Sequence, residues 1–192
     1  MRLFLGKEGD LFLDVGAHAG RWTIPLARTF RKVVALEPNP YSAQALSENV
    51  ESHGLENVAV WNVGATYEPG MRFLTELDWT PSRSTLYPEH SGLRATRGFW
   101  SYFVKLDEWF TGASFLKIDA EGSEYDILKG AQGLLTEETR FCIETHSDRL
   151  LGECAALLRS IGADFQTVTL DEDAPGSLHA RSHEKHRYLV RA

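Results

Sequence analysis

The stretch LFLDVGAHAGRWTIPLARTFRKVVALEPNP, residues 11–40, contains the arrangement that decides the fold. Its first part, LFLDV (11–15), is a short apolar run typical of a buried strand, and a glycine-containing turn follows it. A helix fits GRWTIPLARTFR (20–31), and KVVALE (32–37) is a second strand that ends at the triplet PNP. This strand–helix–strand order predicts a right-handed βαβ unit with two parallel strands.

The same alternation continues along the rest of the chain. We expect further strands at 57–63, 115–119 and 141–145, helices at about 41–53, 124–135 and 148–161, and a closing hairpin from 165–170 and 186–192. Strands that alternate with helices predict an α/β fold, in which helices cover both faces of a mainly parallel sheet. No repeat or linker divides the 192 residues, so we expect one domain over 1–192.

The composition narrows the classes of partner and compartment. The formal net charge is −7, from 27 acidic and 20 basic side chains, which disfavours a nucleic-acid partner because phosphate binding needs clustered cations. The two cysteines, Cys142 and Cys154, form no metal-like motif, and we interpret both as reduced core residues of a cytoplasmic protein. We expect no signal peptide and no membrane partner, because no apolar run is long enough to span a bilayer.

Polar residues stand at the ends of the expected strands. They are Asp14, Glu37, Asn62, Asp119 and Glu144. In open α/β sheets the carboxyl ends of the parallel strands meet at one edge, and ligands bind in the crevice outside it. The pattern therefore predicts a ligand site at that edge.

The first turn, DVGAHAG (14–20), indicates which ligand binds there. A dinucleotide needs G-x-G-x-x-G, but His18 and Arg21 break that pattern and Asp14 would repel a phosphate. S-adenosylmethionine (SAM) carries a sulfonium and an ammonium, so an acidic turn suits it. We expect Asp14, Gly16, Ala17, His18 and Gly20 to bind this cofactor, and an NAD(P)-dependent reductase remains the alternative.

The ends of the next two strands complete the expected cofactor site. Glu37 ends the second strand, where a carboxylate can accept hydrogen bonds from both ribose hydroxyls, and Pro38 and Asn39 follow it. NVGA (62–65) ends the third strand with small residues and an amide, which suits an adenine edge. The expected set there is Asn62, Gly64 and Ala65.

These segments resemble the FkbM family of SAM-dependent methyltransferases. LDVGAHAG resembles the family's DVGAN-x-G turn, with His18 in place of the usual Asn, and ALEPNP (35–40) resembles its second strand ending. FLKIDAEGSEYDILKGA (115–131) is similar to the signature K-I-D-x-E-G-x-E with L-x-G-A, and CIETH (142–146) is similar to the next strand ending. The resemblance implies the Rossmann-like class I methyltransferase fold, with seven strands of which the last is antiparallel. It also implies methyl transfer to a hydroxyl oxygen, usually of a small molecule or sugar.

The resemblance leaves one departure. Larger relatives have N-terminal helices that help to cover the site, whereas about ten residues precede the first strand here. The cover is either missing or supplied by a second copy or a partner chain. A SAM-binding module without turnover, which acts on a partner, also stays open.

The charged residues near 119 are the catalytic candidates. Asp119 is expected to orient the acceptor hydroxyl or accept its proton, and His146 to act as general base. Glu121 either faces the substrate or caps a helix, and Lys117 pairs with Asp119 or Glu144. We expect no metal ligands, although assistance by a divalent ion stays open.

Two features of the surrounding segments complete the prediction. Ser123, followed by Asp126, fits a capping box, and Glu124 suits the helix dipole.

The segment at about 75–103 is longer than an ordinary loop and carries Tyr87, Phe99 and Trp100. We interpret this insert as a lid or substrate wall, with a peripheral hairpin as the alternative. The connection 171–185 is expected at the same edge.

Overall fold

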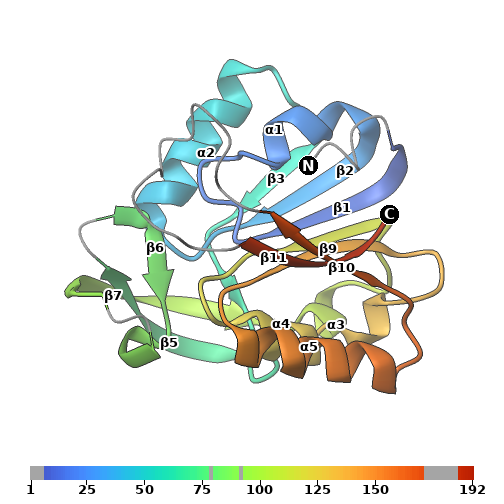
Figure 1. The fold of residues 1–192 in the computed structure, drawn as a ribbon. Coiled ribbons are helices and arrows are strands. Elements are labelled where there is room, and N and C mark those ends of the chain that lie inside the picture. The colour runs from blue at the N-terminus through green and yellow to red at the C-terminus, as the bar shows by residue number, and fades with distance from the viewer. Residues whose placement is uncertain (1–6, 78–79, 91–92, 171–185) are drawn as a thin grey trace.

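The structure is a computed structural model that describes residues 7–77, 80–90, 93–170 and 186–192 (Figure 1). The connection 171–185, which we expected at the ligand edge, lies outside the described residues.

A seven-stranded sheet forms the centre, in the order β10-β11-β9-β8-β1-β2-β3. Five neighbouring strands are parallel, and β11 runs antiparallel to β9 and to β10. Their bounds are β1 Gly9–Val15, β2 Phe30–Leu36, β3 Val58–Trp61, β8 Phe115–Ile118, β9 Arg140–Thr145, β10 Gln166–Leu170 and β11 His186–Arg191. The α/β fold with an antiparallel last strand is therefore confirmed.

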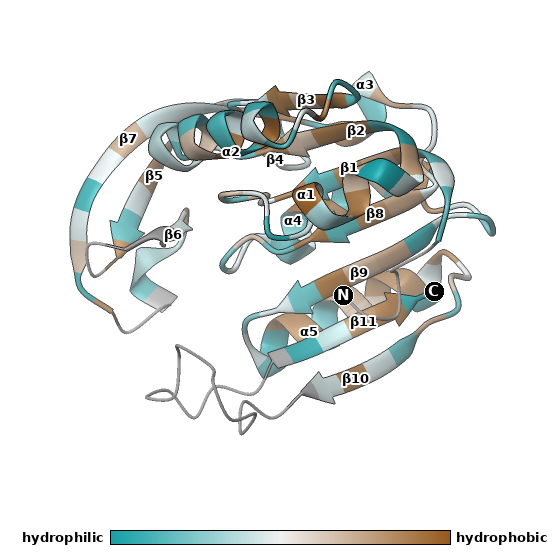
Figure 2. Ribbon diagram, turned by 90° about the horizontal axis from the view of Figure 1, so that it is seen from above, coloured by the Kyte–Doolittle hydropathy of each residue, from teal (hydrophilic) through white to brown (hydrophobic). Residues whose placement is uncertain are grey.

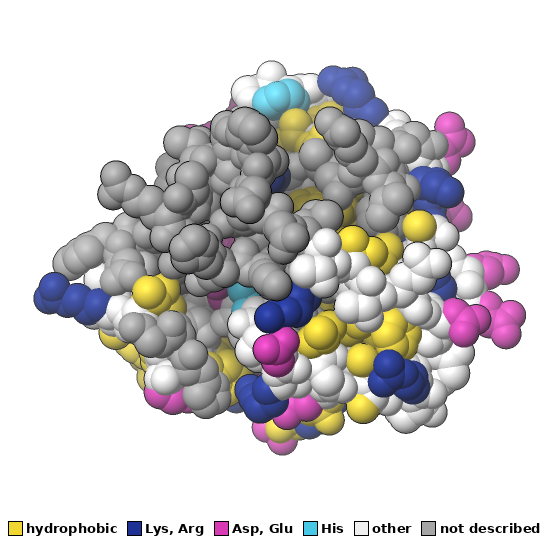
Figure 3. All heavy atoms as spheres, in the orientation of Figure 1, with side chains coloured by type: hydrophobic (Ala, Val, Ile, Leu, Met, Phe, Trp, Pro, Cys, Tyr) yellow, Lys and Arg dark blue, Asp and Glu magenta, His cyan; other side chains and the backbone are white. Residues whose placement is uncertain are grey.

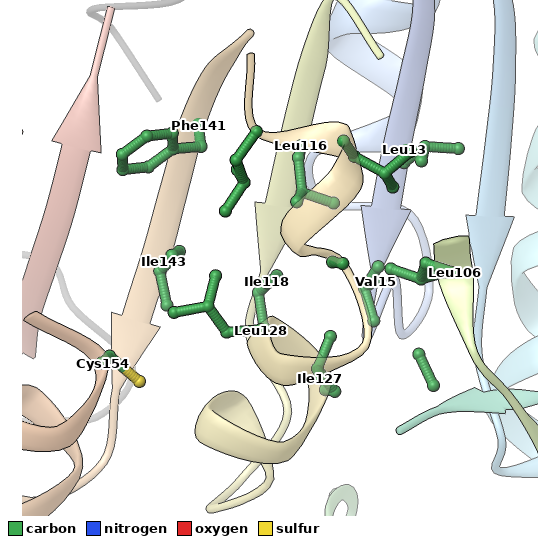
Figure 4. Close-up of a cluster of buried hydrophobic side chains, with 14 of the residues drawn as sticks. Leu13, Val15, Leu106, Leu116, Ile118, Ile127, Leu128, Phe141, Ile143 and Cys154 are labelled. Atoms are coloured by element: carbon green, nitrogen blue, oxygen red, sulfur yellow. The ribbon is translucent and has the colours of Figure 1, made fainter. Parts of the chain in front are cut away.

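Helices cover both faces of this sheet (Figure 1). One face carries α1 (Thr23–Leu26) and α2 (Pro40–Ser52), and the other carries α3 (Leu106–Trp109), α4 (Glu124–Lys129) and α5 (Asp148–Ser160). The main core lies on the second face, where Ile127 and Leu128 of α4 point toward Ile118 and Val15 of the sheet (Figure 4). Among the described residues, no helix has both the length and the apolar character that crossing a bilayer requires.

Two expected helices are shorter than the sequence pattern indicated. The helix at 20–31 is reduced to α1 and a 3-10 turn at Ala27–Thr29, because Phe30 enters β2 and its ring packs 5.3 Å from that of Phe12. The helix at 124–135 ends at Lys129. Gly130 lies so close to the backbone of Thr66 that a Cβ on it would sit 2.5 Å from the Thr66 carbonyl oxygen.

A second sheet of four strands, in the order β4-β7-β5-β6, contains most of the expected insert. Its strands are β4 Gly64–Ala65, β5 Gly70–Leu77, β6 Thr80–Thr85 and β7 Ala95–Val104. Seen from above, this sheet curves beside the carboxyl ends of the central strands (Figure 2). One face buries Leu74, Glu76 and Phe103. From the sequence we interpreted this insert as a lid or substrate wall, with a peripheral hairpin as the alternative, and did not predict a four-stranded sheet.

Candidate active site

The turn after β1 packs directly on the turn after β8. Gly16 has φ +74°, and a Cβ on it would lie 1.8 Å from the carbonyl oxygen of Asp119. The amides of Gly16 and Ala17 both donate to the Leu36 carbonyl, at 2.9 and 3.1 Å. Only glycine allows this contact, so the sequence motif and the position of Asp119 depend on each other.

Glu37 is held between two turns at the end of β2. Its Oε2 accepts the amide of His18 and its Oε1 accepts the amide of Asn39, both at 2.8 Å. Burial raises the pKa of Glu37 to about 7, although the two amide hydrogen bonds oppose that rise. A carboxylate has about four acceptor positions, so two remain for hydroxyl donors.

Asp14 and Lys117 form a buried ion pair beneath the first turn. They face each other in the β1–β8 register, and Lys117 Nζ lies 3.1 Å from Asp14 Oδ1. Thr23 Oγ1 donates to Asp14 Oδ2 at 2.6 Å, and Lys117 Nζ donates to the carbonyl of Gly16 at 2.6 Å. Burial lowers the pKa of Lys117, but the nearby carboxylates, Asp14 first, outweigh it and the net direction is upward.

This pairing changes the expected partner of Lys117. The sequence predicted Asp119 or Glu144, whereas Asp14 is nearest and Asp119 lies at 3.7 Å. Asp119 and Glu121, at the same edge, keep side chains that are 31% and 34% exposed.

Asp119, Glu121 and Glu124 surround His146, which follows β9. His146 Nδ1 lies 2.7 Å from Glu124 Oε1, and its Nε2 lies 3.6 Å from Asp119 Oδ1 and 3.8 Å from Glu121 Oε1. Burial lowers the pKa of His146, but the hydrogen bond and charge of Glu124 and the two other acids raise it to about 10. His146 is therefore an imidazolium at neutral pH, and its expected role as base requires that it first lose a proton.

Glu124 also organises the turn that the sequence assigned to Ser123. The Ser123 side chain makes no capping hydrogen bond, so that expectation was wrong. Instead, the buried Glu124 Oε1 accepts the amides of Gly122 at 3.0 Å and Ala120 at 3.3 Å. The signal for its role was present, since an acid in the first turn of a buried helix needs a partner.

The other expected cofactor residues divide into two groups. Asn62 Nδ2 donates to the Glu37 carbonyl at 2.8 Å and to the Pro38 carbonyl at 3.2 Å, so Asn62 joins the ends of β2 and β3, and its contact with the adenine stays a prediction. The second group packs into the protein instead. Gly20 (φ +95°) lies against Leu46, the Ala17 and Ala65 methyl groups are buried in apolar clusters, and Gly64 lies against the Phe103 ring.

Residues of the insert contact the segment after β2 and the turn after β8. Asn39 Nδ2 donates to Ser84 Oγ at 3.0 Å, and Thr85 Oγ1 donates to the Glu121 carbonyl at 2.7 Å. Tyr87 donates its hydroxyl hydrogen to Asp126 of α4. Sequence reasoning did not identify these contacts. Within the described ranges, no group of three His, Cys, Asp or Glu side chains is placed to hold a metal ion.

Comparison with known proteins places these features in a family. The family profile described as "Methyltransferase FkbM domain" matches residues 14–165. The crystal structure of a methyltransferase FkbM from Methylobacillus flagellatus KT superposes with a TM-score of 0.71 at 18% identity, and it covers 100% of this chain and 46% of that one.

Two further proteins are similar to this chain, one in sequence and one in fold. "Methyltransferase 1" of Beauveria bassiana is 24% identical over 147 residues, which are 64% of this chain and 59% of the relative. M. jannaschii TYW2, solved in complex with AdoMet, has a TM-score of 0.54 at 15% identity and covers 98% of this chain and 70% of that one. The chain thus spans less than two thirds of the FkbM structure and of the curated relative.

Proposed function

The chain belongs to the FkbM family of methyltransferases, and from this membership we propose that it transfers the methyl group of SAM to a hydroxyl oxygen of a small molecule or sugar-containing metabolite. The observation that carries the proposal is Glu37, whose two oxygens accept the amide of His18 in the glycine turn and the amide of Asn39 after β2. The bound AdoMet of the TYW2 structure supports the choice of cofactor.

The residues at the edge fit such a cofactor. The free acceptor positions of Glu37 suit a ribose diol, and the turn at 16–20 brings backbone close to a ligand. The partly exposed Asp119 and Glu121 suit a positive charge. Bound SAM would supply an activated methyl group, and this chain would hold and aim the acceptor. We assign to Asp119 the hydrogen bond that orients the acceptor hydroxyl.

The second sheet is proposed as the wall on the acceptor side. We propose that this sheet belongs to one domain over residues 1–192. Its Ser84 contacts Asn39, which follows β2, and its Thr85 contacts Glu121, which follows β8. On the face seen in Figure 3, the coloured basic side chains are spread among acidic and apolar ones. This distribution and the net charge of −7 favour a small molecule over a polyanion, and a second copy or partner chain is proposed to complete the cover.

The test of this function begins with cofactor binding. Thermal-shift measurements with SAM, S-adenosylhomocysteine, NAD and NADP are expected to show stabilisation by the first two alone. Radiolabelled SAM is then assayed against hydroxylated small molecules, with bulk tRNA as a further arm. Stabilisation by NAD alone, or methylation of tRNA alone, would reject the proposal.

Replacement of Asp119 by asparagine is expected to lower kcat about 100-fold, because an amide is a poorer acceptor for the hydroxyl hydrogen. The KM for SAM should change much less. The control is Asp10→Asn, at an exposed position whose carboxylate pairs with Arg31 on the surface, which should retain full activity. Equal kcat values for both variants would remove Asp119 from the mechanism.

The affinity for SAM is expected to fall as the pH drops below about 7. The pKa of Glu37 is raised to about 7, so acidification protonates the carboxylate and removes acceptor positions for the ribose. Calorimetric titration between pH 5.5 and 8 would measure this. Glu37→Gln should bind weakly and lose the part of the pH dependence that Glu37 contributes near pH 7, so its affinity should fall less on acidification than that of wild type. A pH profile identical to that of wild type would assign the effect elsewhere.

A further inference from the structure

A buried acid and a histidine form a pair at the site that the proposed function does not yet use. Glu124 is fully buried at the start of α4, and its Oε1 lies 2.7 Å from His146 Nδ1. The same oxygen accepts the amides of Gly122 and Ala120, which fixes the carboxylate in place. The imidazole therefore has one orientation, with Nδ1 toward α4 and Nε2 toward Asp119 and Glu121.

The other side of the ring faces two further acids. Asp119 Oδ1 and Glu121 Oε1 lie 3.6 and 3.8 Å from Nε2, and about a quarter of the His146 side chain is exposed. Three carboxylates thus surround one imidazole, which favours its charged form.

Charged groups on the neighbouring elements have partners of their own. Lys117 of β8 pairs with Asp14, and Arg187 of β11, opposite Thr145, pairs with Asp148 at 3.1 Å. On α4, Asp126 accepts the Tyr87 hydroxyl. Lys117 also lies 3.7 Å from Asp119, whereas the proton on His146 is shared among all three acids.

Resting on the proposed function, we propose that Glu124 is a positioning residue for His146, and that the proton of this pair is displaced to solvent when the cationic cofactor binds. A positive charge within about 4–6 Å changes the proton affinity of a group by about 10- to 1000-fold. The cofactor brings such a charge to the acids that hold the proton. A 1000-fold change, the upper end of this range, lowers the pKa of His146 from about 10 to about 7, so that at pH 8 binding converts the imidazolium into a neutral imidazole.

The neutral ring has the form that a general base requires. Nδ1–H still donates to Glu124, and the lone pair of Nε2 lies on the side of Asp119 and Glu121, where we place the acceptor. As the bond from the acceptor oxygen to the methyl carbon forms, the carbon–sulfur bond breaks with its electron pair on sulfur. The hydroxyl proton passes to Nε2. The products are a methyl ether, S-adenosylhomocysteine and the imidazolium, which restores the starting charge.

The test is the number of protons released on cofactor binding. SAM is titrated into the protein by calorimetry at pH 8 in three buffers of different ionisation enthalpy, and the slope of the heat against that enthalpy counts protons. We expect wild type to release about one proton per SAM and Glu124→Gln to release close to none, because its histidine is already neutral at this pH. The difference between the two removes any contribution from the amino group of the cofactor.

Two controls make the result specific. S-adenosylhomocysteine lacks the sulfonium charge and should release fewer protons from wild type. Glu153→Gln, which removes a surface acid paired with Arg149 on α5, should behave as wild type. NMR of the His146 ring, assigned with His146→Gln, reads the protonation state directly and does not depend on the folding of Glu124→Gln.

The outcomes separate this inference from the proposed function. If SAM binds but the heat does not depend on the buffer, or if the His146 ring stays doubly protonated in the complex, the inference is overturned and the methyltransferase proposal survives. If neither SAM nor S-adenosylhomocysteine binds, both are overturned.

Discussion

Replacement of Gly16 by alanine is expected to destabilise the protein by about 4 kcal/mol or more, at the upper end of single substitutions. The left-handed backbone at φ +74° contributes about 1–2 kcal/mol of that loss, because a Cβ is strained there. The larger part comes from the Asp119 carbonyl oxygen, 1.8 Å from the new Cβ position. That oxygen belongs to backbone and cannot rotate away. Urea unfolding would measure the loss, provided that the variant folds.

Gly54 supplies the matched control for this prediction. Its φ is +61°, but a Cβ there would meet nothing within 4 Å. Gly54→Ala should therefore cost only the strain of the left-handed backbone, about 1–2 kcal/mol. If Gly16→Ala and Gly54→Ala had equal midpoints, the close packing of the two turns would not be a source of stability.

Replacement of Lys117 by methionine is expected to cost about 3–5 kcal/mol of unfolding free energy. The change retains most of the side-chain volume but leaves Asp14, which is fully buried, without a counter-charge. It also removes the donor to the carbonyl of Gly16. Urea unfolding at pH 7 would measure the loss.

Two comparisons distinguish a buried pair from ion pairing in general. Arg31→Met breaks the pair with Asp10, whose side chains are 75% and 79% exposed, and should cost at most about 1 kcal/mol. Adding Asp14→Asn to Lys117→Met should recover part of the loss, because the orphaned charge is removed. Purely additive losses in the double variant would show that the two side chains do not interact.

The sequence predicts the fold here because its pattern is local. The unit 11–40 reads as strand, turn, helix and strand, and β1 and β2 form where the apolar runs stand. What it could not predict depends on distant contacts. Phe30 leaves the expected helix because the Phe12 ring is available to it, and Gly130 ends another because Thr66 lies against it.

In the candidate site, too, local sequence patterns were predictive, and contacts between distant residues were not. The strand ends that carry Glu37 and Asp119 were identified from position alone, because parallel strands share an edge. The partner of Lys117 was not, since pattern gives the strands but not their register. The pairing of Glu124 with His146 joins residues 22 apart, and helix-terminus rules explained the acid equally well as a dipole effect.

The hydrogen bonds that Ser84 accepts and Thr85 donates have a consequence for redesign of this protein. These neighbours on one strand are hydrogen-bonded to the two segments that follow β2 and β8, so the proposed acceptor wall is joined directly to the proposed cofactor site. Exchanging the insert for that of a relative to obtain a new acceptor would then alter cofactor affinity as well. Libraries that vary the insert should keep both hydroxyl-bearing positions constant.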